Sequence, residues 1–405
     1  MLVSEFDYHL PLERIAQHPA EPRDSARLMH VQTSAPLPQI ISHHIARDLP
    51  ELLRPDDLLI MNDTRVLRAR LHGHKLTGGK VEALLLREVE RNLWEVLLRP
   101  SARLKEGSEI IFQSNEVEVH AVCEKRLDHT WHLRFVGAWH AMPTSAADLG
   151  TARRAHTSFN KSTFPRRHSE RATATEESSK STFDIRNLLQ DLGEVPLPPY
   201  IHTKAADPER YQTIYSKEHL QSTASLDSAA APTAGLHFTP QLLDAIRARG
   251  IQYAHVTLGI GLGTFLPVKS ETLEDHQMHF EEYDIPESTA NAIAAQKQAG
   301  KRVVAVGTTV ARTLEAASAN GELHSGPGST DIFIYPPYRF RCVDAMLTNF
   351  HLPKSTLLAM VSALADNLRG SESDLTGIEI MQHAYKIAVQ ESYRFFSFGD
   401  AMLIE

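Results

Sequence analysis

Cysteine is nearly absent from this chain, since only Cys123 and Cys342 occur among its 405 residues. Two isolated cysteines cannot form a disulfide framework or a cysteine-rich zinc site, so we expect a protein of the reducing cytoplasm. No run of about 18 apolar residues is present either, which argues against a membrane-spanning helix. Glu5 and Asp7 lie within the first eight residues, and acidic residues there argue against a secretory signal.

An excess of positive charge is also missing, because 42 Lys and Arg residues stand against 50 Asp and Glu residues, giving a net charge of −8. This balance argues against a nucleic-acid coat protein, but it allows a local basic patch that could bind one folded RNA. Apolar residues make up 42% of the chain, which is ordinary for a globular protein. A chain of 405 residues exceeds the usual size of one core, so two domains are expected.

Short alternating segments in the first half of the chain predict a small β-barrel. Their bounds are 66–72, 80–87, 93–99, 109–112, 117–123 and 130–135. From residue 251 onward, strand-like segments alternate with helix-like ones, which predicts a mostly parallel sheet covered by helices. The strands are expected at 251–256, 302–307 and 330–334, and the helices at 239–249, 308–319 and 354–366.

The predicted architecture is therefore an α/β domain built from both ends of the chain, residues 1–65 and 195–405, with a β-barrel domain of residues 66–194 inserted. Within the barrel, residues 138–183 are rich in Ser, Thr and Arg and poor in aliphatic residues. We expect a flexible loop there, because such a composition buries little apolar surface. The alternative is a basic arm that contacts RNA phosphates. A second polar insertion, 219–228, is expected to form a loop over the active site.

Two loops rich in small residues flank one predicted helix and one predicted strand. The first, 231–238, reads Ala-Pro-Thr-Ala-Gly-Leu-His-Phe, and the second, 257–265, places glycine at three alternate positions, 259, 261 and 263. Glycines remove side chains and let a ligand approach the backbone closely, although a bulge and a tight turn would use them equally well. Because His237 and Thr264 lie in these loops, we place the active site here.

Polar residues follow several predicted strands. Asp63 and Arg65 come after an apolar strand, Thr308 and Thr309 follow Gly307, and the segment 349–355 joins another strand to a helix. Ligands of α/β sheets bind beyond the carboxyl ends of strands, and a helix start offers free N–H groups to an anion. Asp63 and Arg65 could equally form a structural ion pair, and Thr308 or Thr309 could be a plain helix cap.

The spacing His276-x-x-His279-x-Glu281 resembles a metal-ligand triplet. However, residues 278–284 alternate like a strand, which would put His279, Glu281 and Tyr283 on one face and leave His276 in a loop. With 22 histidines in the chain, such a spacing also arises by chance. We therefore expect no metal, and acid–base or hydrogen-bonding roles for these residues.

Several long motifs together resemble the S-adenosylmethionine:tRNA ribosyltransferase-isomerase family of queuosine biosynthesis. They are Phe6-Asp7-Tyr8-x-Leu10-Pro11, Arg23-Asp24-x-Ala26-Arg27-Leu28, Asn62-Asp63-Thr64-Arg65-Val66, Gly78-Gly79-Lys80-Val81-Glu82, Leu197-Pro198-Pro199-Tyr200-Ile201, Tyr211-Gln212-Thr213-x-Tyr215, the loop 231–238, Gly307-Thr308-Thr309 and Leu347-Thr348-Asn349-Phe350-His351-Leu352-Pro353. The resemblance covers essentially the whole chain, and the two polar insertions depart from the family pattern.

The resemblance implies that the ribosyl part of S-adenosylmethionine is transferred to a tRNA and isomerised there. The acceptor would be 7-aminomethyl-7-deazaguanine at the wobble position, and the products would be epoxyqueuosine-tRNA, adenine and methionine. It also implies a cytoplasmic monomer that uses S-adenosylmethionine as co-substrate and needs no other cofactor. An ordinary methyltransferase and a non-catalytic tRNA-binding module are the alternatives, and product analysis separates the three.

A sulfonium acidifies the adjacent ribose carbon, so a carboxylate or imidazole base can start such a reaction. The catalytic candidates are Asp63, His237, His279 and Glu281. The substrate-binding candidates are Arg65, Thr233, Gly235, Gly259, Gly261, Gly263, Thr264, Thr308, Thr309, Asn349 and His351.

Overall fold

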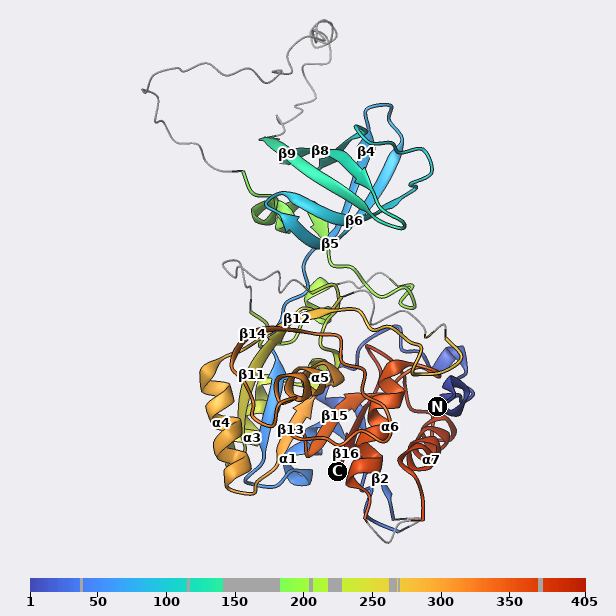
Figure 1. Ribbon diagram of the computed structural model, residues 1–405, viewed down its shortest axis with the longest axis vertical. Coiled ribbons are helices and arrows are strands. Elements are labelled where there is room, and N and C mark those ends of the chain that lie inside the picture. The colour runs from blue at the N-terminus through green and yellow to red at the C-terminus, as the bar shows by residue number, and fades with distance from the viewer. Residues whose placement is uncertain are drawn as a thin grey trace, which may run out of the picture. The chain divides into compact units, whose positions relative to one another are not determined.

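The protein forms two compact units in a computed structural model, which describes residues 1–36, 39–114, 117–140, 183–203, 207–217, 228–261, 268, 270–370 and 374–405. The first unit combines Met1–Ala69 with Glu194–Glu405, and the second is Arg70–Gly193. The chain thus leaves the first unit after Ala69 and returns at Glu194, whereas the sequence placed these boundaries after residues 65 and 194 (Figure 1).

A nine-stranded sheet forms the centre of the first unit (Figure 1). In spatial order its strands are β14 (Gly326–Thr330), β12 (Glu281–Ile285), β11 (Gln252–Leu258), β3 (Leu58–Asn62), β13 (Val303–Val306), β15 (Ala345–Asn349), β16 (Ala401–Ile404), β1 (Arg27–Val31) and β2 (Ile41–Ile45). The central strands β11, β3, β13 and β15 are parallel, whereas β15–β16, β1–β2, β11–β12 and β12–β14 are antiparallel. The expected α/β class is confirmed, and the sheet is mixed.

The central strands are apolar on both faces because both faces are covered. Along β3, Leu58 and Ile60 belong to one core cluster, while Leu59 and Met61 belong to the other. The alternation of side chains along a strand produces this division. Both clusters need helices to exclude water, which explains why β3 and β13 read as continuous apolar runs.

Helices α4, α5, α6 and α7 contribute to the first cluster, and α1 and α3 contribute to the second. Their bounds are α1 (Leu49–Leu52), α3 (Pro240–Ala248), α4 (Glu287–Gln298), α5 (Thr308–Ala317), α6 (Thr356–Leu368) and α7 (Gly377–Gln390). The predicted start of α3 is confirmed, because the Thr239 hydroxyl accepts a hydrogen bond from the N–H of Leu242 at 3.1 Å. Within the described residues, none of these helices is long and apolar enough to cross a membrane.

The second unit is a closed barrel, as the sequence predicts. Its strands are β4 (Arg70–Lys75), β5 (Lys80–Glu90), β6 (Leu93–Arg99), β7 (Glu109–Gln113), β8 (Val117–Arg126) and β9 (Trp131–His140). They pair in the order β4-β5-β6-β9-β8-β7, and β7 pairs again with β4, which closes the barrel. A short helix, α2 (Leu189–Leu192), and strand β10 (Gly193–Glu194), which pairs with β4, complete the unit.

Two strand predictions are wrong. The segment expected at 330–334 is not a strand, because β14 ends at Thr330 and its pairing with β12 ends there too. The segment expected at 66–72 begins only at Arg70, since Val66 makes a single isolated bridge to Ser228. In both cases the apolar character of the segment reflects burial in a loop, which periodicity alone does not distinguish from a strand.

The expectations for the insertion 138–183 concern a segment of which only residues 138–140 and 183 are described. For the insertion 219–228, only Ser228 is described. The predictions about both insertions therefore lie outside the described residues.

Candidate active site

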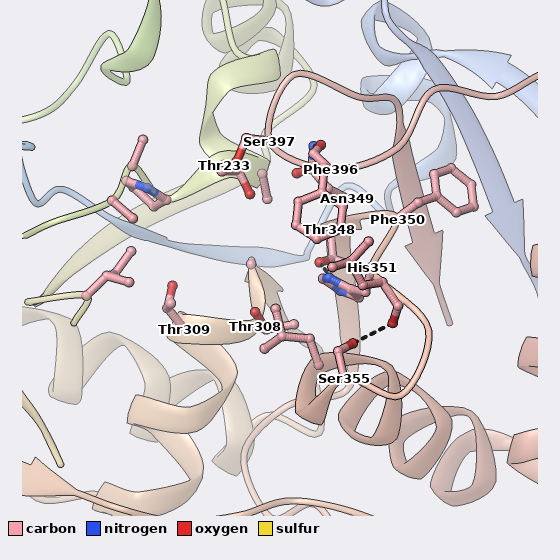
Figure 2. A pocket seen from close by; sticks show the side chains of 18 of the residues that line it. Thr233, Thr308, Thr309, Thr348, Asn349, Phe350, His351, Ser355, Phe396 and Ser397 are labelled. Carbon is pink, nitrogen blue, oxygen red and sulfur yellow. Dashed lines mark hydrogen bonds between the residues drawn. The ribbon is translucent and has the colours of Figure 1, made fainter. Parts of the chain in front are cut away.

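A cavity of about 210 Å³ lies in the first unit, where β13 and β15 end (Figure 2). These two strands are parallel neighbours, so their carboxyl ends meet at one edge of the sheet. The residues that line the cavity come from six segments of the chain. They are Tyr200, Ala230–Ala234, Ile260, Gly307–Thr309, Thr348–Ser355 with Leu357, and Phe396–Ser397.

Five of the predicted binding residues meet here, namely Thr233, Thr308, Thr309, Asn349 and His351. Figure 2 shows Thr308 and Thr309 at the start of α5 on one side, with Thr233, Asn349 and Ser397 on the other. The strand-end loops therefore converge as expected from an α/β fold.

The start of α5 contributes backbone N–H groups to this cavity. Gly307 turns the chain from β13 into the helix with φ of 100°, a left-handed conformation that favours glycine. Its N–H donates to the carbonyl of Leu347 at 2.8 Å, which fixes the turn to β15. The first N–H groups of a helix have no intrahelical acceptor, and the helix dipole makes this end favourable for an anion.

His351 is a neutral hydrogen-bonding group at the cavity wall. Its Nε2 lies 3.1 Å from the Thr348 hydroxyl, and its backbone N–H donates to the Tyr385 hydroxyl at 2.9 Å. The hydroxyl of Tyr8 donates to its carbonyl. Burial lowers the pKa of His351 to about 3, so the imidazole is uncharged at neutral pH.

His237, which is not among the cavity-lining residues, and Asn349, which is, carry buried polar atoms without a hydrogen-bond partner among the described residues. These atoms are Nε2 of His237 and Oδ1 of Asn349, while Nδ2 of Asn349 donates to the Phe396 carbonyl at 3.1 Å. Burial lowers the pKa of His237 to about 4, and Arg394 acts in the same direction. The Asn349 side chain acts on the pKa of His237 in the opposite direction, as a hydrogen-bonding neighbour, so Asn349, at the cavity wall, is the one of the two that is suited to a ligand.

Asp63 does not line the cavity. It is buried, accepts a hydrogen bond from the Thr257 hydroxyl at 2.7 Å, and forms an ion pair with Lys217 at 3.0 Å. Arg65 is bound to Glu209 at 2.6 Å and to the Ser216 hydroxyl at 3.1 Å. Both residues therefore take part in polar networks beside the end of β3.

The strand that carries Glu281 is shorter than predicted. β12 begins at Glu281, and the buried side of this strand carries Glu281, Tyr283 and Ile285. His279 precedes the strand and is exposed, so the expectation that it shares a strand face with Glu281 is wrong. The alternation of polar and apolar residues begins in the loop before β12, so it predicts a strand that starts too early. Among the described residues, no group of His, Cys, Asp and Glu is arranged to hold a metal ion.

The predicted glycines have different surroundings. Gly235 is packed so closely that an added Cβ would lie 2.2 Å from the Tyr215 hydroxyl. Gly259 is buried, and its N–H donates to the Glu282 carbonyl at 3.0 Å, whereas Gly261 is exposed. Gly263 and Thr264 lie outside the described residues. Close packing against Tyr215 therefore explains why a glycine occupies position 235.

Sequence reasoning missed three residues of this region: Tyr200, Ser397 and Arg312. The hydroxyls of Tyr200 and Ser397 lie 2.6 Å apart at the cavity wall. The segment 395–398 is not a strand, since Phe395 makes a single isolated bridge to Ile15 and β16 starts only at Ala401. Phe396 has φ of 73°, a turn conformation that an apolar pattern does not reveal. Arg312 gave no sequence signal, because one arginine within a helix is unremarkable.

An α/β domain whose strand-end loops line a mostly apolar cavity with a few polar side chains is typical of enzymes that bind a small-molecule substrate. Comparison with known proteins agrees. The model of the family described as queuosine biosynthesis protein matches residues 3–404. The chain therefore belongs to this family.

Its relatives match over the full length of the chain. The S-adenosylmethionine:tRNA ribosyltransferase-isomerases of Moorella thermoacetica and Symbiobacterium thermophilum are each 44% identical over 406 residues, covering 100% of both chains. The crystal structure of S-adenosylmethionine tRNA ribosyltransferase from Thermotoga maritima is 32% identical, covers 99% of this chain and 100% of that chain, and has a TM-score of 0.49.

Proposed function

We propose that this chain is an S-adenosylmethionine:tRNA ribosyltransferase-isomerase. It transfers the ribosyl group of S-adenosylmethionine to 7-aminomethyl-7-deazaguanine at the wobble position of a tRNA and isomerises it. The products are epoxyqueuosine-tRNA, adenine and methionine. Full-length relatives that carry this name support the reaction.

One structural observation carries the proposal for this site. Residues from three separate family motifs, Thr233, Thr308 and Asn349, meet around a single cavity although they are far apart in sequence. A mostly apolar cavity with a few polar groups suits a nucleoside, because threonine hydroxyls and amide groups can hydrogen-bond ribose and adenine. The N-terminal end of α5 favours the anionic end of the same molecule, its methionine carboxylate.

The reaction starts when a base removes a proton from the ribose carbon next to the sulfonium. We favour His237, which ends the turn that begins at the cavity residue Thr233, because it is buried and its low pKa keeps the ring neutral, although it is not itself among the cavity-lining residues. Asp63 and Glu281 are each held by a cation, Lys217 and Arg312 respectively, so we assign them supporting roles. The substitution His237→Ala should lower kcat by about a hundredfold or more while leaving the melting temperature nearly unchanged.

Product analysis tests the reaction. The purified protein is incubated with S-adenosylmethionine and a tRNA that carries the aminomethyl-deazaguanine. We expect free adenine and methionine, and a digested tRNA nucleoside with the mass of epoxyqueuosine. S-adenosylhomocysteine with a methylated base would indicate a methyltransferase instead, and the absence of any product would indicate a binding protein.

We further propose that the enzyme acts as a monomer in the cytoplasm, where tRNA and S-adenosylmethionine occur together. No resident metal or cofactor is required, because the sulfonium itself acidifies the ribose carbon. Light scattering should give the mass of one chain, and a dimer mass would contradict the first part of this proposal.

A further inference from the structure

Arg312 is a buried cation on α5 whose charge is only partly satisfied. Its Nη1 donates to Oε2 of Glu281 at 2.6 Å, and both side chains are about 95% buried, with 5% and 4% exposed. The other two nitrogens, Nε and Nη2, are buried and have no hydrogen-bond partner in the part of the chain that the structure describes. A buried guanidinium edge without an acceptor is costly, so its presence requires an explanation.

The two unpartnered nitrogens form one edge of the guanidinium. Their N–H bonds run parallel, and this is the geometry that binds the two oxygens of a carboxylate. In Arg302 of the same chain, the corresponding edge is occupied by a carboxylate. There, Nε and Nη2 donate to the two carboxylate oxygens of Asp57 at 2.8 and 2.7 Å. Arg312 presents the same edge without a carboxylate.

The position of Arg312 on α5 relates it to the candidate active site. It follows Thr308 by four residues and Thr309 by three, so it shares the helix face of these two cavity residues. Long helical side chains lean toward the N-terminus of their helix, which directs the guanidinium toward the first turn of α5.

Glu281, the partner of Arg312, lies next to another residue of the cavity wall. In the β11–β12 pairing, Leu258 lies opposite Tyr283, and Gly259 donates to Glu282. Continuing this register places Ile260, which lines the cavity, opposite Glu281. Arg312 therefore lies on a helix that begins at the cavity wall, and its partner Glu281 lies beside the wall residue Ile260.

We propose that the Nε–Nη2 edge of Arg312 binds the α-carboxylate of S-adenosylmethionine, with Glu281 fixing the guanidinium from the other side. This inference rests on the proposed function, because it assumes S-adenosylmethionine as the ligand. The positive end of α5 favours the same anion. Since both nitrogens are buried, the carboxylate reaches them only after neighbouring side chains shift, so binding includes a local rearrangement.

A ligand without the carboxylate tests this role. Calorimetry without tRNA compares the Kd of S-adenosylmethionine with that of its decarboxylated analogue, which keeps the sulfonium, ribose and adenine. We expect the native protein to prefer S-adenosylmethionine. In Arg312→Lys, which keeps the charge but loses the parallel edge, this preference should fall at least tenfold, which corresponds to about 1.4 kcal/mol.

Arg302→Lys is the matched control, because it removes an occupied edge that lies outside the cavity lining. It should lower the melting temperature and leave the preference for S-adenosylmethionine unchanged. If Arg312→Lys does not fold, the double variant Arg312→Met with Glu281→Met removes both buried charges together and should show the same loss of preference.

Equal weakening of both ligands in the Arg312 variants would overturn the proposal and assign Arg312 a structural role. Equal affinity of the native protein for the two ligands would overturn it as well. Neither result bears on the formation of epoxyqueuosine-tRNA, which is measured separately. Failure of the carboxylate site and failure of the proposed function are therefore distinguishable.

Discussion

At the scale of single residues, hydrogen-bond satisfaction separates groups that hold the fold from groups that face the ligand. Asn62 and Asn349 are both buried, and each is the last residue of a strand of the central sheet, β3 and β15 respectively. Oδ1 of Asn62 accepts from the N–H groups of Thr64 and Leu258, both at 3.1 Å, whereas Oδ1 of Asn349 accepts nothing. The same type of side chain therefore stabilises the backbone at the end of one strand and offers an open acceptor at the end of the other.

This difference predicts opposite results for two alanine variants. Asn349→Ala should raise the KM for S-adenosylmethionine at least tenfold and change the melting temperature little, because its unsatisfied acceptor is suited to a ligand. Asn62→Ala should lower the free energy of unfolding by about 1–3 kcal/mol, since it leaves buried N–H groups without an acceptor. Steady-state kinetics and thermal melts on both variants check this. A large loss of stability in Asn349→Ala with an unchanged KM would assign it a structural role.

The buried histidines predict a loss of stability in acid. The pKa of His237 is lowered to about 4 in the folded protein and is about 6.5 when the chain is unfolded. Between these values the unfolded state binds more protons, so stability falls as the pH falls. His237 alone should account for a loss of roughly 2 kcal/mol between pH 7 and pH 5.

Denaturant unfolding at several pH values measures this loss. His237→Gln, which cannot titrate, should show a shallower fall in stability over the same range. His351 should contribute in the same direction, because its pKa is lowered to about 3. A native protein and a glutamine variant with the same pH dependence would contradict the prediction.

At the scale of secondary structure, α5 joins the core to the cavity. Val310 and Leu314 belong to the first core cluster, and Thr308 and Thr309, the first two residues of the helix, line the cavity. Gly307 allows the abrupt change from β13 to this helix. Packing of α5 therefore fixes the position of the N–H groups that face the ligand.

Gly307→Ala should weaken both folding and ligand binding. The left-handed conformation at φ of 100° costs a residue with a side chain about 1–2 kcal/mol, although the space around Gly307 is open to 3.6 Å. Gly78→Ala is the control, because Gly78 has φ of 84° in a turn of the barrel with open space around it. Both variants should lose similar stability in thermal melts, but only Gly307→Ala should raise the Kd for S-adenosylmethionine. Unchanged binding in Gly307→Ala would separate the helix start from the ligand.

At the scale of the whole molecule, the barrel is inserted into the chain of the α/β unit but contributes no residue to the cavity wall. Every residue of the cavity wall belongs to the unit formed by Met1–Ala69 and Glu194–Glu405. The proposed S-adenosylmethionine site thus lies within one unit, and the chemistry proposed for it uses only groups of this unit.

We predict that activity does not depend on a bound metal. The positive charge that acidifies the ribose carbon is supplied by the sulfonium of the substrate, so a Lewis acid is not needed. Enzyme treated with EDTA and then desalted should retain full activity with tRNA that was refolded separately in Mg²⁺. Loss of activity that one equivalent of Zn²⁺ or Mn²⁺ restores would contradict this prediction.

The sequence alone determined the class of the fold, because it depends on local periodicity. Five of the six barrel strands and the helices α3, α5 and α6 were predicted close to their observed positions, since their apolar spacing and caps are local signals. Long motifs likewise identified the family and five residues of the cavity wall.

Only the tertiary structure decided which polar residues share a site. Asp63, His237, His279 and Glu281 looked equally suitable in sequence, yet none of the four is among the residues that line the cavity. Whether a side chain is satisfied depends on partners distant in the chain, such as Lys217 for Asp63 and Arg312 for Glu281. The open edge of Arg312 was invisible for the same reason, because hydrogen-bond satisfaction arises only when segments far apart in sequence pack together.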